Sequence, residues 1–355
     1  MAAARSRRAG RPGPTLEQVA ARAGVGRGTV SRVVNGSPRV SDRTRAAVQE
    51  AVAELGYVPN RAARALAAGS ADAIALVVLE PESRLFAEPY FSGMLRGVSG
   101  ELAENDLQLL LTLVRDQRER DRFVQYAAAH RVDGALLVSV HTGDPLPDLL
   151  RGTGMPAVLG GRRTEAEPLP FVDSDNFGGA RLAAGHLLAG GRSRVATITG
   201  PMDMYVSQCR LDGYRAALRE AGLRVAEDER LIAHADFTER GGHAAMRRLL
   251  SCGPLPDAVF CASDVMAAGA RIALREAGLQ VPRDVALVGF DDSAVARHMD
   301  PPLTTVRQPI EDMGREMARM LLELMEAQRE NGTGAPLPAP PGRVLPTSLV
   351  RRGSS

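Results

Sequence analysis

Hydrophobic residues recur at two different spacings along the chain, and the change of spacing divides the chain near residue 70. Over residues 15–56 they follow helical spacing in three short stretches. From residue 73 onward, short apolar runs rich in β-branched residues alternate with helical patterns. The first pattern predicts a small all-α domain. The second predicts parallel β-sheets built from βαβ units.

The first helix is predicted to begin just after Thr15, because Thr15 and Gln18 have the spacing of a capping box. The apolar positions that follow end at Ala23. Residues 24–26, with the sequence GVG, then form a short turn in which the glycines can take positive φ and Val25 can point into a core. This turn is therefore expected to lead directly into a second short helix.

Two more helices complete the predicted head. The stretch Arg27–Val34 places its valines on one face, and Asn35-Gly36 ends it. A third helix starts at Ser41 and ends at Gly56, which has the position of a C-terminal cap. Three short helices with a three-residue turn predict a helix-turn-helix, whose second helix lies in the major groove of DNA.

The polar face of the second helix carries the candidate DNA contacts. Arg27 and Arg32 are the candidate base readers, because an Arg can donate two hydrogen bonds to guanine. Thr29, Ser31 and Asn35 are candidate phosphate contacts, which fix the register without reading sequence. The alternative is that these residues form only the solvated face of an amphipathic helix.

A short basic helix is predicted after the head, where Asn60 can cap residues 60–67. It is too short to be stable alone, so we expect DNA to order it. Leu66 between basic residues fits an apolar wedge for the minor groove, although it could instead pack on the core domain. The candidate DNA-binding residues are therefore Thr15, Arg27, Thr29, Ser31, Arg32, Asn35, Asn60, Arg61 and Leu66.

Charge is distributed unevenly, although the net charge of the whole chain is only +2. Residues 1–69 hold 12 Arg against four acids, a net charge of +8, whereas the remainder holds 32 Arg against 38 acids, a net charge of −6. A basic end of this kind attracts a polyanion such as DNA. Residues 1–14 are rich in Arg, Gly and Pro, which predicts a disordered basic arm.

The larger part of the chain, residues 73–355, is predicted to be a two-lobed α/β domain with parallel sheets. Ligands of such domains bind at the carboxyl ends of the strands, here in the cleft between the lobes. Arg210, Phe237 and Asp291 have positions just past predicted strands or at a helix start. A fixed cation, an aromatic face and a carboxylate are groups suited to a sugar.

The segment TLEQVAARAGVGRGTVSRVVNG, followed by YVPNRAARAL, resembles the DNA-binding head and hinge helix of the LacI/GalR family. Later segments, among them VDSDNFGGA, RLDGYRAAL, CASDVMAAGA and VALVGFDD, recur in the order of that family, so the likeness covers about residues 15–351. The resemblance implies a periplasmic-binding-protein-like core whose chain crosses between lobes near Ser174, Leu303 and Asn331. It also adds cleft candidates, which makes the predicted effector-binding set Tyr90, Phe91, Asp175, Arg210, Phe237, Ser263 and Asp291.

The resemblance divides the chain into a basic arm (1–14), a helix-turn-helix domain (15–59), a hinge helix with linker (60–72) and an effector-binding and dimerisation domain (73–355). It implies a homodimeric repressor on double-stranded operator DNA, released by a small-molecule effector. The segments AEPYFSGMLRGV and DDSAVARHMDPPLT are most similar to actinobacterial repressors of cellobiose or cello-oligosaccharide utilisation. Maltose-type sugars and other β-glucosides remain alternative effectors.

Other classes of protein fit the sequence less well. No catalytic residue, cofactor or metal site is predicted, because the six histidines lack metal-ligand spacing and the glycines of residues 24–28 follow a helix instead of a strand. A secreted solute-binding protein would need a signal peptide in place of the basic head, and no apolar run approaches the roughly 18 residues of a membrane helix. An architectural DNA binder would leave the large domain without a purpose. The cytoplasm is the expected compartment.

Overall fold

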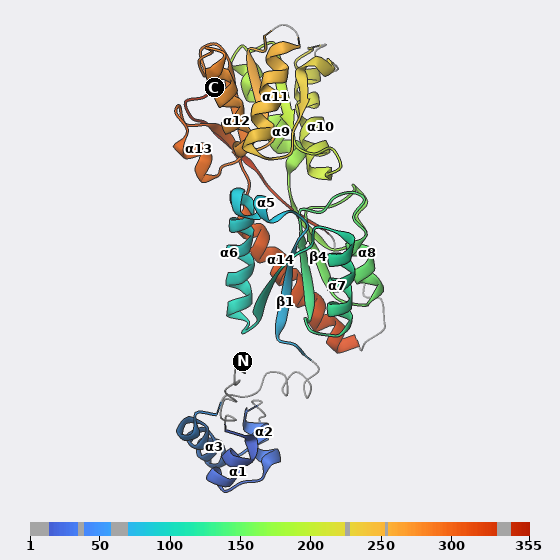
Figure 1. Ribbon diagram of the computed structural model, residues 1–355, viewed down its shortest axis with the longest axis vertical. Helices are drawn as coiled ribbons and strands as arrows, with labels where there is room; N and C mark the ends of the chain where they lie inside the picture. Colours follow the sequence, from blue (N-terminus) through green and yellow to red (C-terminus); the bar gives the residue numbers. More distant parts are fainter. Residues whose placement is uncertain (1–13, 35–38, 58–69, 224–227, 253–254, 332–341) are drawn as a thin grey trace, which may run out of the picture. The chain divides into compact units, whose positions relative to one another are not determined.

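A computed structural model of the chain describes residues 14–34, 39–57, 70–223, 228–252, 255–331 and 342–355. The chain divides into two compact units, Met1–Ala71 and Asp72–Ser355 (Figure 1). Residues 1–13 of the predicted basic arm lie outside the described residues, as do the candidates Asn35, Asn60, Arg61 and Leu66.

Over its described residues, the smaller unit contains three helices, α1 (Leu16–Ala23), α2 (Arg27–Val34) and α3 (Asp42–Leu55). Both halves of the predicted capping box are present, because Gln18 N donates to Thr15 Oγ1 over 3.3 Å and Thr15 N donates to Gln18 Oε1 over 2.8 Å. Gly24 takes φ 64° after α1, as the predicted turn requires. The helix-turn-helix expected from the sequence is confirmed.

One small core holds these three helices together. Val19, Val30 and Val48, one from each helix, are fully buried and belong to the same hydrophobic cluster. Burial of a valine side chain contributes roughly 1.5–3 kcal/mol. The shared core therefore fixes α2 against its neighbours and leaves the opposite face of α2 free to carry polar side chains.

The first lobe of the larger unit is built on a six-stranded parallel sheet with the order β11-β5-β4-β3-β1-β2 (Figure 1). Its strands are β1 (Ala73–Val78), β2 (Gln108–Leu113), β3 (Gly134–Val138), β4 (Ala157–Gly160), β5 (Phe171–Ser174) and β11 (Arg343–Leu345). Side chains of α6 (Pro89–Glu104) and α14 (Ile310–Asn331) share one hydrophobic cluster with the sheet. Those of α7 (Gln117–Ala128) and α8 (Leu146–Gly152) share the other, so the sheet is covered on both faces. The short helix α5 (Glu82–Ala87) precedes α6.

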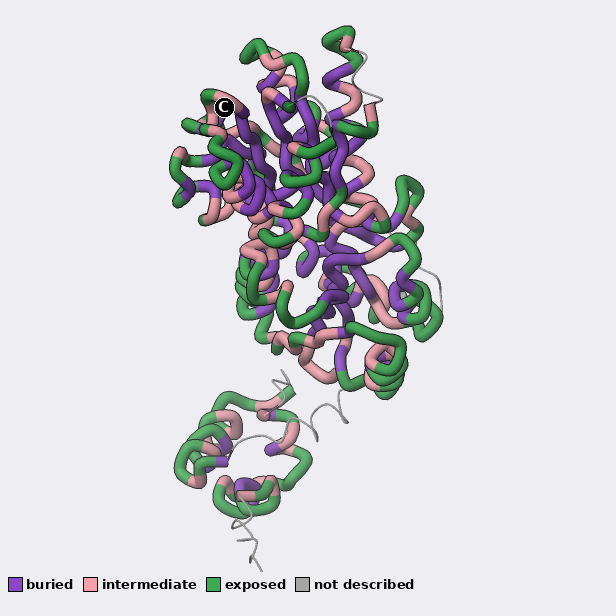
Figure 2. The backbone as a smooth tube through the Cα atoms, turned by 45° about the horizontal axis from the view of Figure 1, so that its top comes forward, coloured by how far each residue is buried: buried purple, intermediate pink, exposed green. Residues whose placement is uncertain are grey.

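The second lobe repeats this plan with the strand order β12-β10-β9-β8-β6-β7. Its strands are β6 (Val195–Thr199), β7 (Ile232–His234), β8 (Ala258–Cys261), β9 (Ala286–Asp291), β10 (Thr304–Arg307) and β12 (Ser348–Val350), of which β12 alone is antiparallel to its neighbour. The covering helices are α9 (Asn176–Ala189) and α10 (Tyr205–Glu220) on one face, and α11 (Glu239–Ser251) and α12 (Asp264–Glu276) on the other. Helix α13 (Ala294–His298) follows β9. The central strands of both sheets are buried (Figure 2).

Between the described elements, the chain crosses from one lobe to the other three times, and two of the predicted crossing points need correction. The first crossing follows Ser174, as expected. The second lies between β10 and α14, at residues 308–309 instead of Leu303, because residues 304–307 form a strand that pairs with β9. The third lies between β11 and β12, at residues 346–347 instead of Asn331, because the chain returns to the first sheet as β11 before it leaves.

Among the described residues, no helix combines the length and the apolar run that a membrane crossing requires. The two-lobed α/β core with parallel sheets is confirmed, and its strands end at the cleft between the lobes.

Candidate functional site

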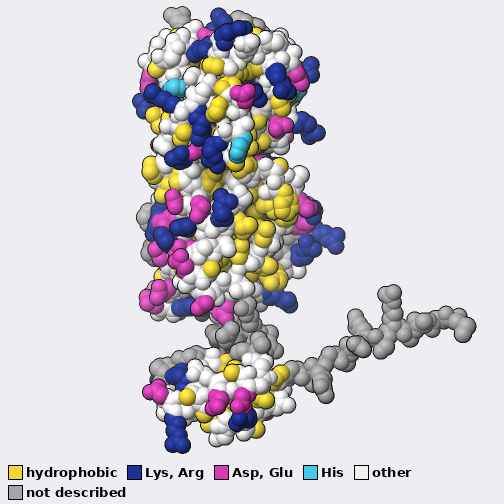
Figure 3. Space-filling model, turned by 90° about the vertical axis from the view of Figure 1, so that its left-hand side faces the viewer, with side chains coloured by type: hydrophobic (Ala, Val, Ile, Leu, Met, Phe, Trp, Pro, Cys, Tyr) yellow, Lys and Arg dark blue, Asp and Glu magenta, His cyan; other side chains and the backbone are white. Residues whose placement is uncertain are grey.

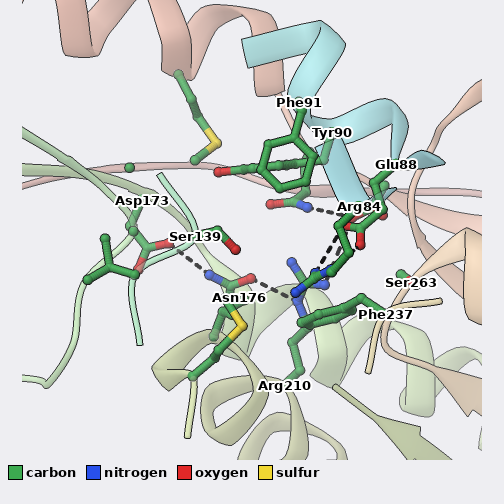
Figure 4. Close-up of a pocket in the computed structure, with 18 of the residues that line it drawn as sticks. Arg84, Glu88, Tyr90, Phe91, Ser139, Asp173, Asn176, Arg210, Phe237 and Ser263 are labelled. Atoms are coloured by element: carbon green, nitrogen blue, oxygen red, sulfur yellow. Dashed lines mark hydrogen bonds and ion pairs between the residues drawn. The ribbon is translucent and has the colours of Figure 1, made fainter. Parts of the chain in front are cut away.

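A pocket lies between the two lobes, at the carboxyl ends of their strands (Figure 4). It holds about 790 Å³ of space free of protein atoms, a figure that includes open solvent at its mouth. Its side chains come from many separate segments of the chain. The lining residues are Arg84, Glu88, Pro89, Tyr90, Phe91, Ser139, Val140, Gly160, Gly161, Arg162, Asp173, Asn176, Met204, Val206, Arg210, Phe237, Ser263, Val265, Asp291, Gln308 and Met313.

The structure brings most of the predicted effector-binding residues together in this pocket. Those that line it are Tyr90, Phe91, Arg210, Phe237, Ser263 and Asp291. Asp175 differs from the expectation, because its side chain accepts a hydrogen bond from Gly178 N over 2.8 Å and caps α9 outside the pocket. Its neighbours Asp173 and Asn176 line the pocket instead.

Arg210 is the central cation of the pocket, and only 5% of its side chain is exposed. Its Nε donates to Asn176 Oδ1 over 2.9 Å, and its Nη1 donates to the carbonyl oxygen of Ala262. The guanidinium carbon lies 3.8 Å from the ring centroid of Phe290, and Nη1 is 3.9 Å from Asp291 Oδ1. Burial lowers the pKa of Arg210, while Asp291 and Asp173 oppose that shift. The guanidinium is thus fixed in place before any ligand arrives.

Two buried carboxyl groups face this cation from opposite lobes. Asp173 accepts from Arg162 Nε over 3.0 Å and from Asn176 Nδ2 over 2.9 Å. Gln308 Nε2 donates to Asp291 Oδ1 over 2.6 Å. Burial raises the pKa of Asp173 and raises that of Asp291 to about 6. The guanidinium of Arg210 donates hydrogen bonds and ionised carboxylates accept them, so the three side chains together suit the hydroxyl groups of a ligand.

Three non-glycine pocket residues, Ser139, Phe237 and Asp291, adopt backbone conformations that disfavour their side chains. Phe237 has φ 62° and Asp291 has φ 119°, both in the region that favours glycine. Such strain costs of order 1–3 kcal/mol and clusters at ligand sites. The ring of Phe237 also packs against Gly200, where an added Cβ would lie 2.1 Å from its Cζ. Gly200 therefore allows the close approach that holds this aromatic ring at the pocket.

A second charged group in the pocket centres on Arg84, which the sequence interpretation missed. Arg84 donates to Glu88 through Nε, 2.5 Å from Oε1, and through Nη2, 3.1 Å from Oε2, and it also pairs with Glu80. Its guanidinium carbon lies 5.6 Å from the ring centroid of Phe237, which belongs to the other lobe. Burial raises the pKa of Glu88 to about 7, although Arg84 pulls it down. In the sequence this pair shows only a four-residue spacing after the first strand, and Arg115 and Glu119 share that spacing outside the pocket.

The lobes also meet beside the pocket through His141. Its Nδ1 lies 2.7 Å from Asp203 Oδ2 of the second lobe, and its Nε2 lies 3.3 Å from Glu80 Oε1 of the first. Thr142 N donates to the carbonyl oxygen of Asp203 over 2.8 Å. The hydrogen bond with Glu80, followed by that with Asp203, raises the pKa of His141 despite partial burial. This histidine therefore joins the two lobes.

The structure places the described DNA-contact candidates on the surface of the smaller unit. Arg27, Arg32 and Thr15 are exposed, and Thr29 and Ser31 are half-buried. Arg27 also pairs with the exposed Glu17, with Nη1 3.1 Å from Oε1. Within the described ranges, no group of three or more His, Cys, Asp or Glu side chains is arranged to hold a metal ion.

Comparison with known proteins finds a matching family model for each of the two units. Residues 15–60 match the bacterial regulatory proteins of the lacI family, and residues 184–355 match the periplasmic binding protein-like domain. The chain is 52% identical over 343 residues to the HTH-type transcriptional regulator CelR of Thermobifida fusca, a match that covers 96% of this chain and 98% of that protein.

Solved structures resemble the whole chain as well. A transcriptional regulator CelR in complex with cellobiose has a TM-score of 0.76 and 48% identity, over 96% of this chain and 100% of that one. A lac repressor dimer bound to operator and the anti-inducer ONPF has a TM-score of 0.83 and 28% identity, over 97% of this chain and 99% of that one.

Proposed function

This chain belongs to the LacI family of bacterial regulatory proteins and is a DNA-binding transcription repressor, and we propose that cellobiose or a closely related β-glucoside is the effector that releases it from its operator. The pocket is the observation that carries this proposal. The buried Arg210 and Asp173 and the largely buried Asp291 present donors and acceptors close to the aromatic ring of Phe237. Sugars offer the matching groups, because their hydroxyls donate and accept while their ring hydrogens pack on aromatic faces.

DNA binding is assigned to the exposed face of α2. Arg27 and Arg32 would read base edges, while Thr29 and Ser31 would contact phosphates. Thr15 would contribute at the start of α1. Asn35, Asn60, Arg61 and the wedge Leu66 complete the proposal from sequence alone.

We assign a homodimer, since two heads on a pseudo-palindromic operator add their half-site energies. Hydrophobic side chains gather on one face of the larger unit (Figure 3), on the side where α5 and α6 lie in Figure 1. Phe86 of α5 is 78% exposed. An exposed aromatic of this size supports a protein contact there. A DNA target supports the further proposal that the protein acts in the cytoplasm.

Release would follow from a change in how the two lobes meet. Contacts such as His141 with Asp203 cross between the lobes beside the pocket. A ligand that binds one lobe arrangement better than another shifts the population toward it. Coupling free energies between such sites are typically about 1–3 kcal/mol.

The proposal is tested with the purified chain and DNA selected from a random-sequence library. We expect one selected sequence to bind far more tightly than bulk DNA, and cellobiose to weaken that binding in a fluorescence anisotropy titration. Calorimetry with cellobiose, maltose, lactose, glucose and ribose then ranks the effectors. If no sequence is preferred, the repressor assignment is wrong. If maltose alone binds and releases DNA, the β-glucoside assignment is wrong.

A further inference from the structure

The residues that lead into α10 of the second lobe contact the first lobe. His141 Nδ1, from the loop after β3, lies 2.7 Å from Asp203 Oδ2. Tyr205 begins α10, and its ring centroid lies 5.2 Å from the guanidinium carbon of Arg162, which follows β4. The same helix carries Arg210, the central cation of the pocket. The first lobe therefore holds the beginning of the helix that presents Arg210.

His141 is the member of these contacts whose ordinary pKa lies near neutral pH. Its other ring nitrogen, Nε2, lies 3.3 Å from Glu80 Oε1 of the first lobe. Thr142 N donates to the carbonyl oxygen of Asp203 over 2.8 Å, which holds the two loops together beside the ring. A neutral imidazole can donate to only one of the two carboxylates, whereas the protonated ring donates to both. Protonation therefore completes the His141 bridge, which consists of Glu80, His141 and Asp203.

Carboxyl groups outnumber arginines around this bridge. Glu80 follows β1 and is only 6% exposed in its side chain, Asp203 precedes α10, and Glu88 precedes α6. Among the described residues, Arg84 of α5 is the one arginine within ion-pair distance of these three acids, and it pairs with both Glu80 and Glu88. A protonated His141 supplies a second cation to the group.

Other charged groups on the neighbouring loops already have partners. Ser139 Oγ donates to Glu80 Oε1 over 2.7 Å and is the uncharged neighbour of the bridge on its own loop. The paired groups are Asp144 with Arg120, Asp173 with Arg162, and both Asp148 and Glu167 with Arg163. The charge that remains to be balanced is therefore at the His141 bridge.

We propose that protonation of His141 holds the loop before α10 against the first lobe, so that the proton is a second regulator of the pocket and strengthens ligand binding at acidic pH. The inference rests on the proposed function, since the ligand is taken to be a sugar. A ligand in the pocket would contact Asp173 of the first lobe and Arg210 of the second, so it favours the arrangement in which the lobes are held together. Coupling between two sites is reciprocal, so ligand and proton strengthen the binding of each other.

The electrostatics of the bridge agree with this direction. The hydrogen bond with Glu80, followed by that with Asp203, raises the pKa of His141 despite partial burial. Burial opposes ionisation of Glu80, but His141 and Arg84 lower its pKa overall. An arrangement that separates Asp203 from His141 removes one of the carboxylates that favour the imidazolium. The proton is therefore bound more weakly when the lobes separate at this point.

The first test measures proton binding to His141 without any sugar. The full-length protein, isotope-labelled at its histidine rings, is titrated by NMR from pH 5.5 to pH 8.5, and the signal that is missing from His141→Gln identifies the residue. Asp203→Asn changes only the other lobe, and it should weaken proton binding to His141 by about 2- to 5-fold. An unchanged titration of His141 in Asp203→Asn would overturn the proposal.

The second test measures the coupling to the ligand. Calorimetry with cellobiose across the same pH range, in buffers of different ionisation enthalpy, gives both the affinity and the number of protons taken up. Toward acidic pH, the affinity of the wild type should rise by about 2- to 5-fold more than that of His141→Gln, and the variant should take up fewer protons. The variant is needed because burial raises the pKa of Glu88 to about 7 and that of Asp291 to about 6, so both titrate in this range. Equal pH dependence of the two proteins would overturn the proposal.

His243→Gln is the matched control. His243 Nε2 lies 2.8 Å from Glu276 Oε2, and these side chains are 26% and 55% exposed, against 28% and 65% for His141 and Asp203. Both residues of the control pair belong to the second lobe, on α11 and α12, so the pair does not join the lobes. This variant should keep the wild-type pH dependence of cellobiose binding, and its loss would overturn the assignment to His141. Thermal unfolding checks that each variant is folded.

The two tests separate failure of this proposal from failure of the proposed function. A wild type that binds no sugar at any pH contradicts the proposed function, and the coupling to sugar is then wrong as well. The NMR titration does not depend on sugar, so weaker proton binding in Asp203→Asn would still establish that His141 joins the lobes. Sugar binding with no difference in pH dependence between wild type and His141→Gln contradicts the proton coupling alone.

Discussion

The two functional regions of this protein use arginine in opposite ways. In the helix-turn-helix head, Arg27 pairs with Glu17, and their side chains are 70% and 60% exposed. In the pocket, Arg210 faces Asp291, and their side chains are 5% and 14% exposed. An exposed pair is screened by water and salt, so its cation remains available to the phosphates and bases of DNA. A buried cation is held by fixed partners and is available only to a ligand that enters.

The comparison indicates that the head binds DNA through exposed arginines. The pocket instead binds its ligand through side chains that are held in place beforehand. The phosphates of DNA attract an exposed arginine over a long range, and the side chain loses its conformational entropy only when DNA binds. A neutral sugar exerts no such attraction, so its partners need to be oriented beforehand. A variant of Arg27 or Arg32 should therefore weaken DNA binding alone. A variant of Arg210 should weaken sugar binding.

Arg210→Met should have the largest effect. It leaves Asp291 without the cation that faces it, while Asp173 keeps Arg162, and breaking a buried pair costs about 3–5 kcal/mol. We expect loss of detectable cellobiose binding in calorimetry and a clear fall in the denaturant midpoint of the larger unit. Operator binding should persist and no longer respond to sugar. A variant that binds cellobiose like the wild type would show that Arg210 is structural only.

Arg32→Ala and, in parallel, Arg27→Ala should have the next largest effect. Each should weaken DNA binding and leave sugar binding unchanged. Loss of a bidentate contact to guanine costs about 1–3 kcal/mol and relaxes specificity at one base pair. Anisotropy on operators substituted at each position measures that relaxation. Calorimetry with cellobiose should give the wild-type affinity. A uniform loss on every sequence would instead assign the residue to phosphate contact.

Local patterns predicted the head well, because its determinants are near each other in sequence. Thr15 and Gln18 cap α1 over three residues, and Gly24 and Gly56 end helices with positive φ. These features depend only on neighbouring residues, so a single sequence contains them. The fold of the larger unit was also predictable from its alternating strands and helices.

The pocket was only partly predictable, because burial depends on contacts between distant segments. Arg84–Glu88 and Arg115–Glu119 have the same spacing, yet burial raises the pKa of Glu88 to about 7, whereas hydrogen bonds from Arg115 lower that of Glu119 to about 2. Nothing local distinguishes the two pairs. The sequence prediction chose Asp175 instead of Asp173 for a similar reason, because the point at which β5 ends decides which of the two side chains faces the pocket. The crossing at residues 346–347 depends on β11 and β12, which pair with strands more than 40 residues away.

Glu17→Gln tests the exposed ion pair of Arg27 and Glu17 in the head and should have a small effect. It removes a negative charge beside Arg27 while it keeps the shape of the side chain. Thermal unfolding should change little, because both side chains are exposed. Operator affinity in low salt should rise by a few-fold, and the gain should shrink as salt is added. An operator affinity that falls would mean that Glu17 positions Arg27 for DNA.

His141→Gln tests the contact between the lobes and should have the smallest effect. Hydrogen bonds with Glu80 and Asp203 raise the pKa of His141 in the folded state above its ordinary value of about 6.5. A group with a raised folded pKa contributes stability below its unfolded pKa, and that contribution is lost as pH rises through the folded pKa. The wild type should therefore exceed the variant in stability most at pH 5.5, by roughly 1 kcal/mol or less for a partly exposed pair, and the difference should decrease toward pH 8.5. Thermal unfolding of both proteins across this range measures the difference. A constant difference would mean that the neutral imidazole makes the contact and that no proton is linked to the joining of the lobes.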